Sequence, residues 1–402
     1  MSSSTVDLSV EFCTIRFPNP FVLASGPITD NAEKVIRAFR SGWGGAILKT
    51  ISMVPERHTQ VTPRFGRHMY RGHVIGLTNM EISSPYPLEW WIEGVRSIKR
   101  EFPDRPLFAS IMRTEDRTER DWVLATEAFQ DAGVDGIELN FSCSHAFHTK
   151  GGGASIGKDP KATRTIAGWV ATVAKVPVIA KLTCATSDIG RIAKAAVKGG
   201  VHGITAINSV PGIEGIDFET MTPKPIVDGL SSFTGYSGPA IKPIGLRSVA
   251  EIRRAVSIPI MGCGGVWRWE DAVDYMAMGA TLVQLCTGPW VQGFGMIQDL
   301  TTGLTRFLKR KGFSRVMDLT GIAFPKLVDH GDLSREYRVV ARVDIHKCKK
   351  CKQCFFACFD GANAAVELAQ DGTATVLRDR CIGCSLCSQV CPVPGAIVME
   401  KV

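Results

Sequence analysis

Eight cysteines near the end of the chain form two runs of identical spacing, and these runs constrain the fold more than any other feature. The first run is Cys348-x2-Cys351-x2-Cys354-x3-Cys358, and the second is Cys381-x2-Cys384-x2-Cys387-x3-Cys391 followed by Pro392. This spacing is typical of a ferredoxin with two [4Fe–4S] clusters, in which the fourth cysteine of each run ligates the cluster of the other run. The sequence therefore predicts one cluster held by Cys348, Cys351, Cys354 and Cys391, and a second held by Cys381, Cys384, Cys387 and Cys358.

Zinc and disulfides are the alternative uses of such cysteines. Structural zinc sites use pairs of closely spaced ligands, not triplets with a distant fourth ligand, and disulfides do not explain a duplicated triplet. The one irregularity is Phe359, which stands where the second run has Pro392. The pattern indicates a protein that moves electrons one at a time.

The composition of the 402 residues suggests about two domains and a reducing environment. Thirteen cysteines, many with cluster spacing, favour the cytosol over a disulfide-stabilised, secreted scaffold. The N-terminus does not have the pattern of a signal peptide, and no apolar stretch approaches the roughly 18 residues of a membrane span. We therefore expect a cytoplasmic protein without membrane attachment.

The net charge is +8, but the basic residues are scattered except for one concentration at residues 346–352. Nucleic-acid binding therefore has little support. The local concentration is either an ordinary solvated face or a docking surface for an acidic partner.

Short apolar runs alternate with helical stretches between residues 20 and 310, as in repeated βα units. The eight runs cover residues 21–27, 45–51, 106–112, 136–142, 177–184, 203–209, 258–265 and 281–288. Eight such units favour a TIM barrel, an α/β fold whose catalytic residues lie at the carboxyl ends of the strands. An open, doubly wound sheet is the alternative fold.

The domain organisation that follows has three parts: a barrel over residues 1–315, a linker over 316–335 and a ferredoxin-type domain over 336–402. Residues 7–20 are too short for a βα unit, and we expect them to form a hairpin under the barrel. Two long segments, residues 52–105 and 212–245, interrupt the βα rhythm. Segments of such length are commonly lids or binding loops.

Polar residues stand where the predicted strands end. Lys49, Lys181, Asn140 and Asn208 would face an apolar barrel mouth, which is costly unless a ligand satisfies them. The glycines after the seventh strand, together with the polar end of the eighth, match the phosphate site of TIM barrels, where backbone N–H groups hold an anion.

These segments resemble the dihydroorotate and dihydropyrimidine dehydrogenase group of FMN barrels over nearly the whole chain. The segments that carry the resemblance are ILKT (47–50), LTNMEIS (77–83), ASIM (109–112), ELNFSCSH (138–145), AKLT (180–183), AINSV (206–210), GYSGPAIKPIGLR (235–247), GCGG (262–265) and LCTG (285–288). The resemblance implies FMN in the barrel, two [4Fe–4S] clusters in the C-terminal domain, and reduction of a pyrimidine C=C bond as in uracil or thymine.

The resemblance also implies which residues form the site. The residues that match the FMN contacts are Ala24, Ser25, Lys49, Lys181, Asn208, Gly238, Gly264, Gly265, Cys286 and Thr287. Lys181 would lie near the N1/O2 edge of the flavin, where a cation stabilises the reduced ring. The residues expected to contact the substrate are Asn79, Asn140, Ser142, Asn208 and Ser209. Amides suit a pyrimidine because each offers both a donor and an acceptor.

Cys143 is the candidate proton donor. Reduction of a C=C bond conjugated to a carbonyl needs a hydride at one carbon and a proton at the other, and a thiol on a glycine-rich loop can supply the proton. His145, His148 or Lys150 would lower its pKa. A cysteine is more often a small buried hydrophobe, and that is the interpretation for Cys13, Cys184 and Cys263.

Three positions depart from the family pattern. Ser144 replaces the usual Pro, Cys184 follows Lys181-Leu182-Thr183 where Pro-Asn is usual, and Ser209 replaces Thr. These departures leave the substrate open, so dihydroorotate or another cyclic amide remains an alternative to uracil. A third hypothesis is an electron-transfer subunit whose barrel is inactive.

No GxGxxG motif follows a strand and opens a helix in this sequence, so no nicotinamide or FAD domain is evident. The electrons must then come from another polypeptide. We expect an FAD-containing, NAD(P)H-oxidising partner subunit, and hence a hetero-oligomer.

Overall fold

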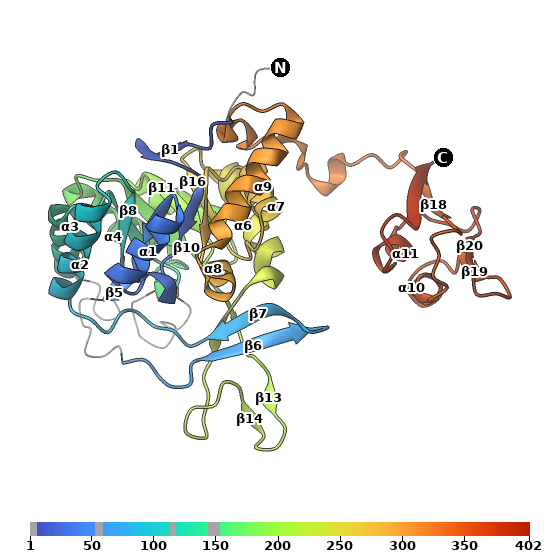
Figure 1. Cartoon of the computed structure of the whole chain (residues 1–402), viewed down its shortest axis with the longest axis horizontal. Helices are drawn as coiled ribbons and strands as arrows, with labels where there is room; N and C mark the ends of the chain where they lie inside the picture. The colour runs from blue at the N-terminus through green and yellow to red at the C-terminus, as the bar shows by residue number, and fades with distance from the viewer. Residues whose placement is uncertain (1–5, 53–58, 113–117, 144–152) are drawn as a thin grey trace. The chain divides into compact units, whose positions relative to one another are not determined.

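Eight strands pair in parallel and close into a barrel (Figure 1). The computed structural model describes residues 6–52, 59–112, 118–143 and 153–402. The barrel strands, in order, are β3 (Phe21–Leu23), β4 (Gly45–Ile47), β8 (Leu107–Met112), β9 (Gly136–Asn140), β10 (Val178–Leu182), β11 (Gly203–Ala206), β16 (Ile260–Cys263) and β17 (Leu282–Leu285). Because β17 pairs with β3 and β4 pairs with β8, the ring is closed. This confirms the predicted TIM barrel and argues against the open sheet.

Helices on the outside of the barrel connect the strands, and the last two helices follow the final barrel strand. They are α1 (Ala32–Ser41), α2 (Leu88–Glu101), α3 (Glu119–Ala132), α4 (Pro160–Val173), α5 (Ile189–Lys198), α6 (Lys242–Ala255), α7 (Trp269–Ala277), α8 (Thr287–Gln292) and α9 (Met296–Lys311). Local sequence fixes several of their ends. The side chain of Asp188 accepts a hydrogen bond from the backbone N–H of Arg191 at the start of α5. Gly42 ends α1 with a left-handed backbone (φ 109°), a conformation that glycine adopts without steric cost.

A hairpin covers the amino-terminal end of the barrel, as predicted for residues 7–20. Its strands β1 (Val10–Phe12) and β2 (Ile15–Phe17) bury the rings of Phe12 and Phe17 completely. Phe17 stacks on Phe108 of β8 with ring centroids 6.2 Å apart. Burial of each ring contributes about 1.5–3 kcal/mol to the free energy of unfolding. A Cβ added at Gly203, the first residue of β11, would lie 2.8 Å from the ring of Phe12, so the plug requires a glycine there.

The two long segments between barrel strands meet in a second sheet, which the sequence did not predict. Its antiparallel order is β12 (Val210–Gly212), β15 (Thr234–Ser237), β7 (His73–Asn79) and β6 (Phe65–Tyr70). Gly235 of β15 pairs with Asn79 of β7, although 156 residues separate them. A short strand β5 (Ile51–Ser52) pairs with β8, and a small hairpin, β13 (Ile216–Asp217) and β14 (Thr222–Pro223), extends from the second segment (Figure 1). The interruptions thus build a platform at the carboxyl ends of the barrel strands.

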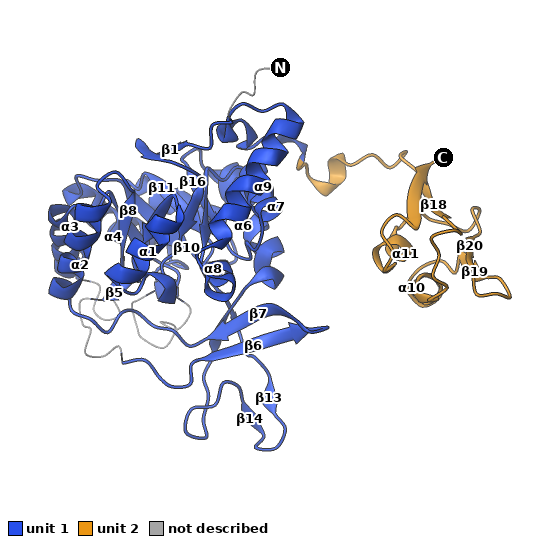
Figure 2. Ribbon diagram, in the orientation of Figure 1, with its two compact units in different colours: residues 1–326 blue, residues 327–402 orange. Residues whose placement is uncertain are grey.

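The chain divides into two compact units, residues 1–326 and residues 327–402 (Figure 2). Unit 2 contains β18 (Val339–Val343), α10 (Gln353–Gly361), β19 (Val366–Leu368), β20 (Ala374–Val376), α11 (Leu386–Gln389) and β21 (Ile397–Lys401). Its small core consists largely of alanines, valines and cysteines. The domain limits at residues 315 and 335 stay a prediction. Among the described residues, no helix is long and apolar enough to cross a membrane.

Candidate functional site

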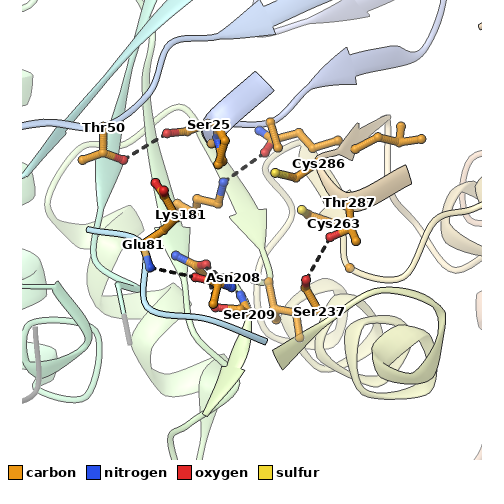
Figure 3. A pocket seen from close by; sticks show the side chains of 18 of the residues that line it. Ser25, Thr50, Glu81, Lys181, Asn208, Ser209, Ser237, Cys263, Cys286 and Thr287 are labelled. Atoms are coloured by element: carbon orange, nitrogen blue, oxygen red, sulfur yellow. Dashed lines mark hydrogen bonds between the residues drawn. The ribbon is translucent and has the colours of Figure 1, made fainter. Parts of the chain in front are cut away.

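A cavity with an empty volume of about 1010 Å³ opens at the carboxyl ends of the barrel strands. Side chains from the barrel and from the antiparallel sheet line it together (Figure 3). With the exception of Ser142, every residue predicted to contact flavin or substrate lies in this wall. These residues are Ala24, Ser25, Lys49, Asn79, Asn140, Cys143, Lys181, Asn208, Ser209, Gly238, Gly264, Gly265, Cys286 and Thr287. Residues from many separate segments therefore meet in one place.

Lys181 lies at the base of this cavity as a buried cation. Its Nζ is 3.5 Å from Oε1 of the fully buried Glu138 and donates to Gln284 Oε1 at 3.3 Å. Oε1 of Glu138 has no hydrogen-bond partner in the described part of the chain. Burial lowers the pKa of Lys181, but the negative charge of Glu138 outweighs this effect and raises the pKa above its usual value. Lys181 therefore remains protonated and can donate into the cavity.

Glu138 is itself held by neutral donors. Its Oε2 accepts from Thr205 Oγ1 at 3.0 Å and from Gln284 Nε2 at 2.9 Å. Glu138 and Gln284 were not among the predicted site residues. The sequence did contain a signal, since a glutamate and a glutamine within apolar strand runs are costly without partners.

A second ion pair involves Lys49, at the end of β4. Its ammonium group contacts Glu81, which also contacts Arg64. Burial raises the pKa of Glu81, but the two cations outweigh this effect and hold the pKa below its usual value. Sequence reasoning missed Glu81 and Arg64 as site residues, although it expected the segment that carries them to be a lid or binding loop.

Glycines after strands β15 and β16 form a backbone cradle. Gly264 and Gly265 have φ values of 119° and 74°, a conformation that disfavours other residues. A Cβ on Gly265 would lie 2.6 Å from the backbone nitrogen of Lys242, the first residue of α6. Thr287 Oγ1 and Ser237 Oγ are 2.9 Å apart and close this end of the cavity (Figure 3). A helix start beside glycine N–H groups suits an anion such as a phosphate.

Two amides are held in place but retain donor capacity. Asn140 Nδ2 donates to Thr50 Oγ1 at 2.9 Å, and Asn208 Nδ2 donates to Ser142 Oγ at 3.0 Å. An amide nitrogen carries two hydrogens. Each residue therefore has a second N–H without a partner among the described residues.

Ser142, which we expected to contact the substrate, is fully buried and does not line the cavity. Its hydroxyl donates to Asn140 Oδ1 at 2.8 Å and accepts from Asn208. The only hydrogen of the hydroxyl and one of its two acceptor positions are thus used by the protein. Ser142 orients the two amides and lies behind the wall.

Cys143 lies in the cavity wall directly after this amide pair and is partly exposed. Its carbonyl oxygen accepts a hydrogen bond from the backbone N–H of Ala154 at 3.1 Å. His145, His148, Lys150 and the family departure at Ser144 lie outside the described residues. Of the other departures, Ser209 lines the cavity and Cys184 does not.

Two further cysteines, Cys263 and Cys286, line the barrel side of the cavity (Figure 3). Burial raises the pKa of Cys286 to about 12, and burial also raises that of Cys263. Both remain neutral thiols at physiological pH. They suit packing against a flat ligand better than proton transfer.

In unit 2, each predicted set of four cysteines lines a separate cavity. Cys348, Cys351, Cys354 and Cys391 line one of about 390 Å³, while Cys358, Cys381, Cys384 and Cys387 line another of about 350 Å³. Within the described ranges, no three His, Cys, Asp or Glu side chains are placed to hold a single metal ion. Backbone N–H groups donate to sulfur, from Ala365 to Cys358 at 3.2 Å and from Ala341 to Cys381 at 3.5 Å. Such donors stabilise the thiolate ligands of a cluster.

The closed barrel, its buried lysine, the glycine cradle and the two cysteine cavities define an oxidoreductase that joins a flavin barrel to a ferredoxin-type module. Comparisons with known proteins agree. Residues 7–308 match the dihydroorotate dehydrogenase family, and residues 341–399 match a 4Fe-4S dicluster domain. The chain belongs to the dihydroorotate dehydrogenase family, and it uses FMN and iron–sulfur clusters as cofactors.

Three relatives illustrate the range of this family. The NAD-dependent dihydropyrimidine dehydrogenase subunit PreA of Escherichia coli is 37% identical over 99% of this chain and 96% of its own length. The chloroplastic dihydropyrimidine dehydrogenase (NADP(+)) of Arabidopsis thaliana is 35% identical over 84% of this chain and 82% of its own. The catalytic subunit of dihydroorotate dehydrogenase B (NAD(+)) of Pyrococcus abyssi is 34% identical over 79% of this chain and 99% of its own.

Proposed function

We propose that this protein reduces the 5,6 double bond of uracil or thymine, with electrons that a partner subunit delivers through the two clusters. The observation that carries the substrate assignment is the charge state of the cavity. Both cations in its described wall, Lys49 and Lys181, already face a carboxylate. A neutral pyrimidine needs no further cation, whereas the carboxylate of orotate does.

The amides supply the complementary polar contacts. Asn140 and Asn208 each present one N–H that no described residue accepts, and a pyrimidine has two carbonyl oxygens. We assign these N–H groups to the substrate carbonyls, with Asn79 and Ser209 at the edge of the ring. Because Ser142 and Thr50 fix the amides, they are oriented before the substrate binds.

The chemistry follows from the conjugation of the C5=C6 bond with the C4 carbonyl. Bound FMN would supply a hydride, and C6 is the carbon that would accept it because it is the electrophilic end of the conjugated system. The Cys143 thiol gives its proton to C5, and the thiolate takes a proton from solvent after product leaves. Lys181 holds a positive charge where negative charge accumulates, and Glu138 keeps that lysine protonated.

The cofactor contacts remain proposals at the level of single residues. The glycine cradle of Gly238, Gly264 and Gly265, together with Thr287, would hold the phosphate of FMN, and Ala24, Ser25 and Cys286 would pack against its ring. The cysteines that line each cavity of unit 2 would ligate one cluster. The cavities support this assignment because they group the cysteines in the crossed pattern.

We assign the electron supply to an FAD-containing subunit that oxidises NAD(P)H. This chain has no dinucleotide-binding fingerprint, and its relative from Escherichia coli is named as a subunit of an NAD-dependent enzyme. The assembly would work in the cytosol, where thiols stay reduced.

The test is to reduce the FMN-loaded full chain with viologen under anaerobic conditions and to follow flavin reoxidation by different substrates. Uracil and thymine should reoxidise the flavin, and orotate should do so much more slowly. Asn140→Asp, which replaces a donor by a carboxylate at a residue assigned to the substrate alone, should abolish reoxidation by uracil while flavin remains bound. Faster reoxidation by orotate would contradict the substrate assignment, and no reoxidation by any pyrimidine would favour an inactive barrel.

A further inference from the structure

The duplicated cysteine runs of unit 2 allow the surroundings of the two cluster cavities to be compared position by position. Around the first run stand Lys349, Lys352, Phe356 and Phe359. The equivalent positions of the second run hold Ile382, Ser385, Gln389 and Pro392. Ligand geometry is shared by the two runs, so it does not explain this difference. The basic and aromatic residues belong specifically to the first run.

The two lysines are exposed and carry uncompensated charge. Lys350 pairs with Asp371 at 2.7 Å, and Lys347 approaches Asp344 at 3.5 Å. In the described part of the chain, no carboxylate lies within 4.0 Å of Lys349 or Lys352. Both also line the cavity of the first cysteine set. Positive charge is therefore concentrated beside Cys348 and Cys351.

Two exposed aromatic rings in the same cysteine run add apolar surface to these positive charges. Phe356 and Phe359, on α10, are 55% and 59% exposed, although aromatic side chains usually bury their rings. Lys352 precedes α10, and its carbonyl accepts a hydrogen bond from Phe356 N–H at 3.2 Å. Phe356 and Phe359 are three residues apart in α10 and so lie on one helix face, and Lys352 stands immediately before that helix. Cys354 and Cys358 lie on the buried side of the same helix.

We propose that the face formed by Lys349, Lys352, Phe356 and Phe359 docks an acidic electron-transfer protein, so that electrons enter beside the first cysteine set. An exposed apolar patch with a charged rim is typical of an interaction surface. Residues 327–402 contain ten Lys and Arg against nine Asp and Glu, so residues 1–326 carry seven of the eight net positive charges. This charge distribution makes a separate acidic protein a better electrostatic complement than a second copy of this chain.

This inference rests on the proposed function only in that electrons come from another protein. The probe is an acidic flavodoxin, whose binding to the full chain is measured by calorimetry when oxidised and whose electron transfer is measured when photoreduced. The test variant is Lys349→Glu/Lys352→Glu. The matched control is Ile382→Glu/Ser385→Glu, which places the same charges at the equivalent positions of the second run. The substitution at Ser385 should be tolerated, because Ser385 and Lys352 have the same left-handed backbone conformation (φ 62° and 64°) and Lys352 already carries a long side chain there.

At low salt, Lys349→Glu/Lys352→Glu should weaken flavodoxin binding and slow electron transfer at least tenfold, because electrostatic steering changes association rates by about 10–10³. The control should stay within about twofold of the unmodified chain, and added salt should reduce the difference between the two. Phe356→Ser/Phe359→Ser should weaken binding at every salt concentration. Reduced viologen is a cation, so its reaction should not be slower in the lysine variant than in the unmodified chain, and a loss seen only with flavodoxin then reports on docking.

Equal losses in the lysine variant and the control, or no loss in either, would overturn the proposal. So would dissociation of an oligomer of this chain by either the lysine or the phenylalanine substitutions in sedimentation experiments, since the face would then bind a second copy. Viologen-driven uracil reduction separates the two proposals. If uracil is not reduced but the flavodoxin results are as expected, only the proposed function is contradicted. If uracil is reduced but flavodoxin binding does not change as expected, only the docking face is contradicted.

Discussion

Glu138→Gln should destabilise the barrel because it leaves the Lys181 ammonium buried without its counter-ion. The two charges are 3.5 Å apart, and the side chains are 0% and 4% exposed. At an effective dielectric constant of about 20, a pair at this distance interacts by about 5 kcal/mol. Removal of one partner of a buried ion pair typically costs about 3–5 kcal/mol. We therefore expect a loss of about 3–5 kcal/mol in the free energy of unfolding.

The loss should depend on pH in a defined direction. In the unmodified protein the pKa of Lys181 is raised, so its ion pair contributes fully below the unfolded-state pKa of about 10.4 and is lost as pH rises through the folded-state pKa. In Glu138→Gln, burial lowers the folded-state pKa of Lys181. The unfolded chain then binds the proton more tightly, and stability rises with pH until the unfolded lysine also titrates. The deficit of the variant should therefore shrink between about pH 7 and pH 10.

Anaerobic urea unfolding of the flavin-free full chain measures this effect. All eight tryptophans lie in residues 43–290, so tryptophan fluorescence reports on the barrel alone. Thr205→Val is the control, because it removes one hydrogen bond to Glu138 but no charge, and its smaller cost should not vary with pH. Glu138→Gln/Lys181→Met should be more stable than Glu138→Gln. A Glu138→Gln protein with normal stability, or with a constant deficit from pH 7 to pH 10, would refute the reasoning.

Three other outcomes follow. Cys143→Ala should keep its FMN but lower kcat for uracil reduction by roughly 10²–10⁴-fold, and Cys143→Ser should do little better because an alcohol is a weaker acid. Cys184→Ala is the control, because this residue lies outside the cavity wall, and it should retain kcat. If Cys143→Ala reduced uracil as fast as the unmodified protein, the proton would have to come from another donor. Anaerobically purified chain should contain about eight iron and eight sulfide ions, four of each per cluster, and a fully active zinc-loaded, iron-free protein would contradict this. The isolated chain should accept electrons from reduced viologen but not turn over NAD(P)H, and rapid NADH oxidation by the chain alone would reveal a nicotinamide site.

The sequence was most informative where function depends on residues close together in the chain. The Cys-x2-Cys-x2-Cys-x3-Cys runs predicted the crossed cysteine sets that line the two cavities of unit 2. The eight apolar runs predicted the barrel strands, because the alternation of strand and helix is a local property. Lys49, Lys181, Asn140 and Asn208 could be assigned to the barrel mouth because each stands near the end of such a run.

Only the tertiary structure shows which charged side chains form ion pairs and which distant segments pair as strands. Glu81 meets Lys49 only because the segment that carries it returns over the mouth of the barrel, and Asn79 meets Gly235 through strand pairing across 156 residues. Ser142 lies outside the cavity wall, where its hydroxyl bonds to Asn140 and Asn208, and its contact with the substrate stays a prediction. Spacing along the chain reports neighbours within one element. Contacts between elements depend on strand register and on the path of connecting segments, and these are set by packing of the whole barrel.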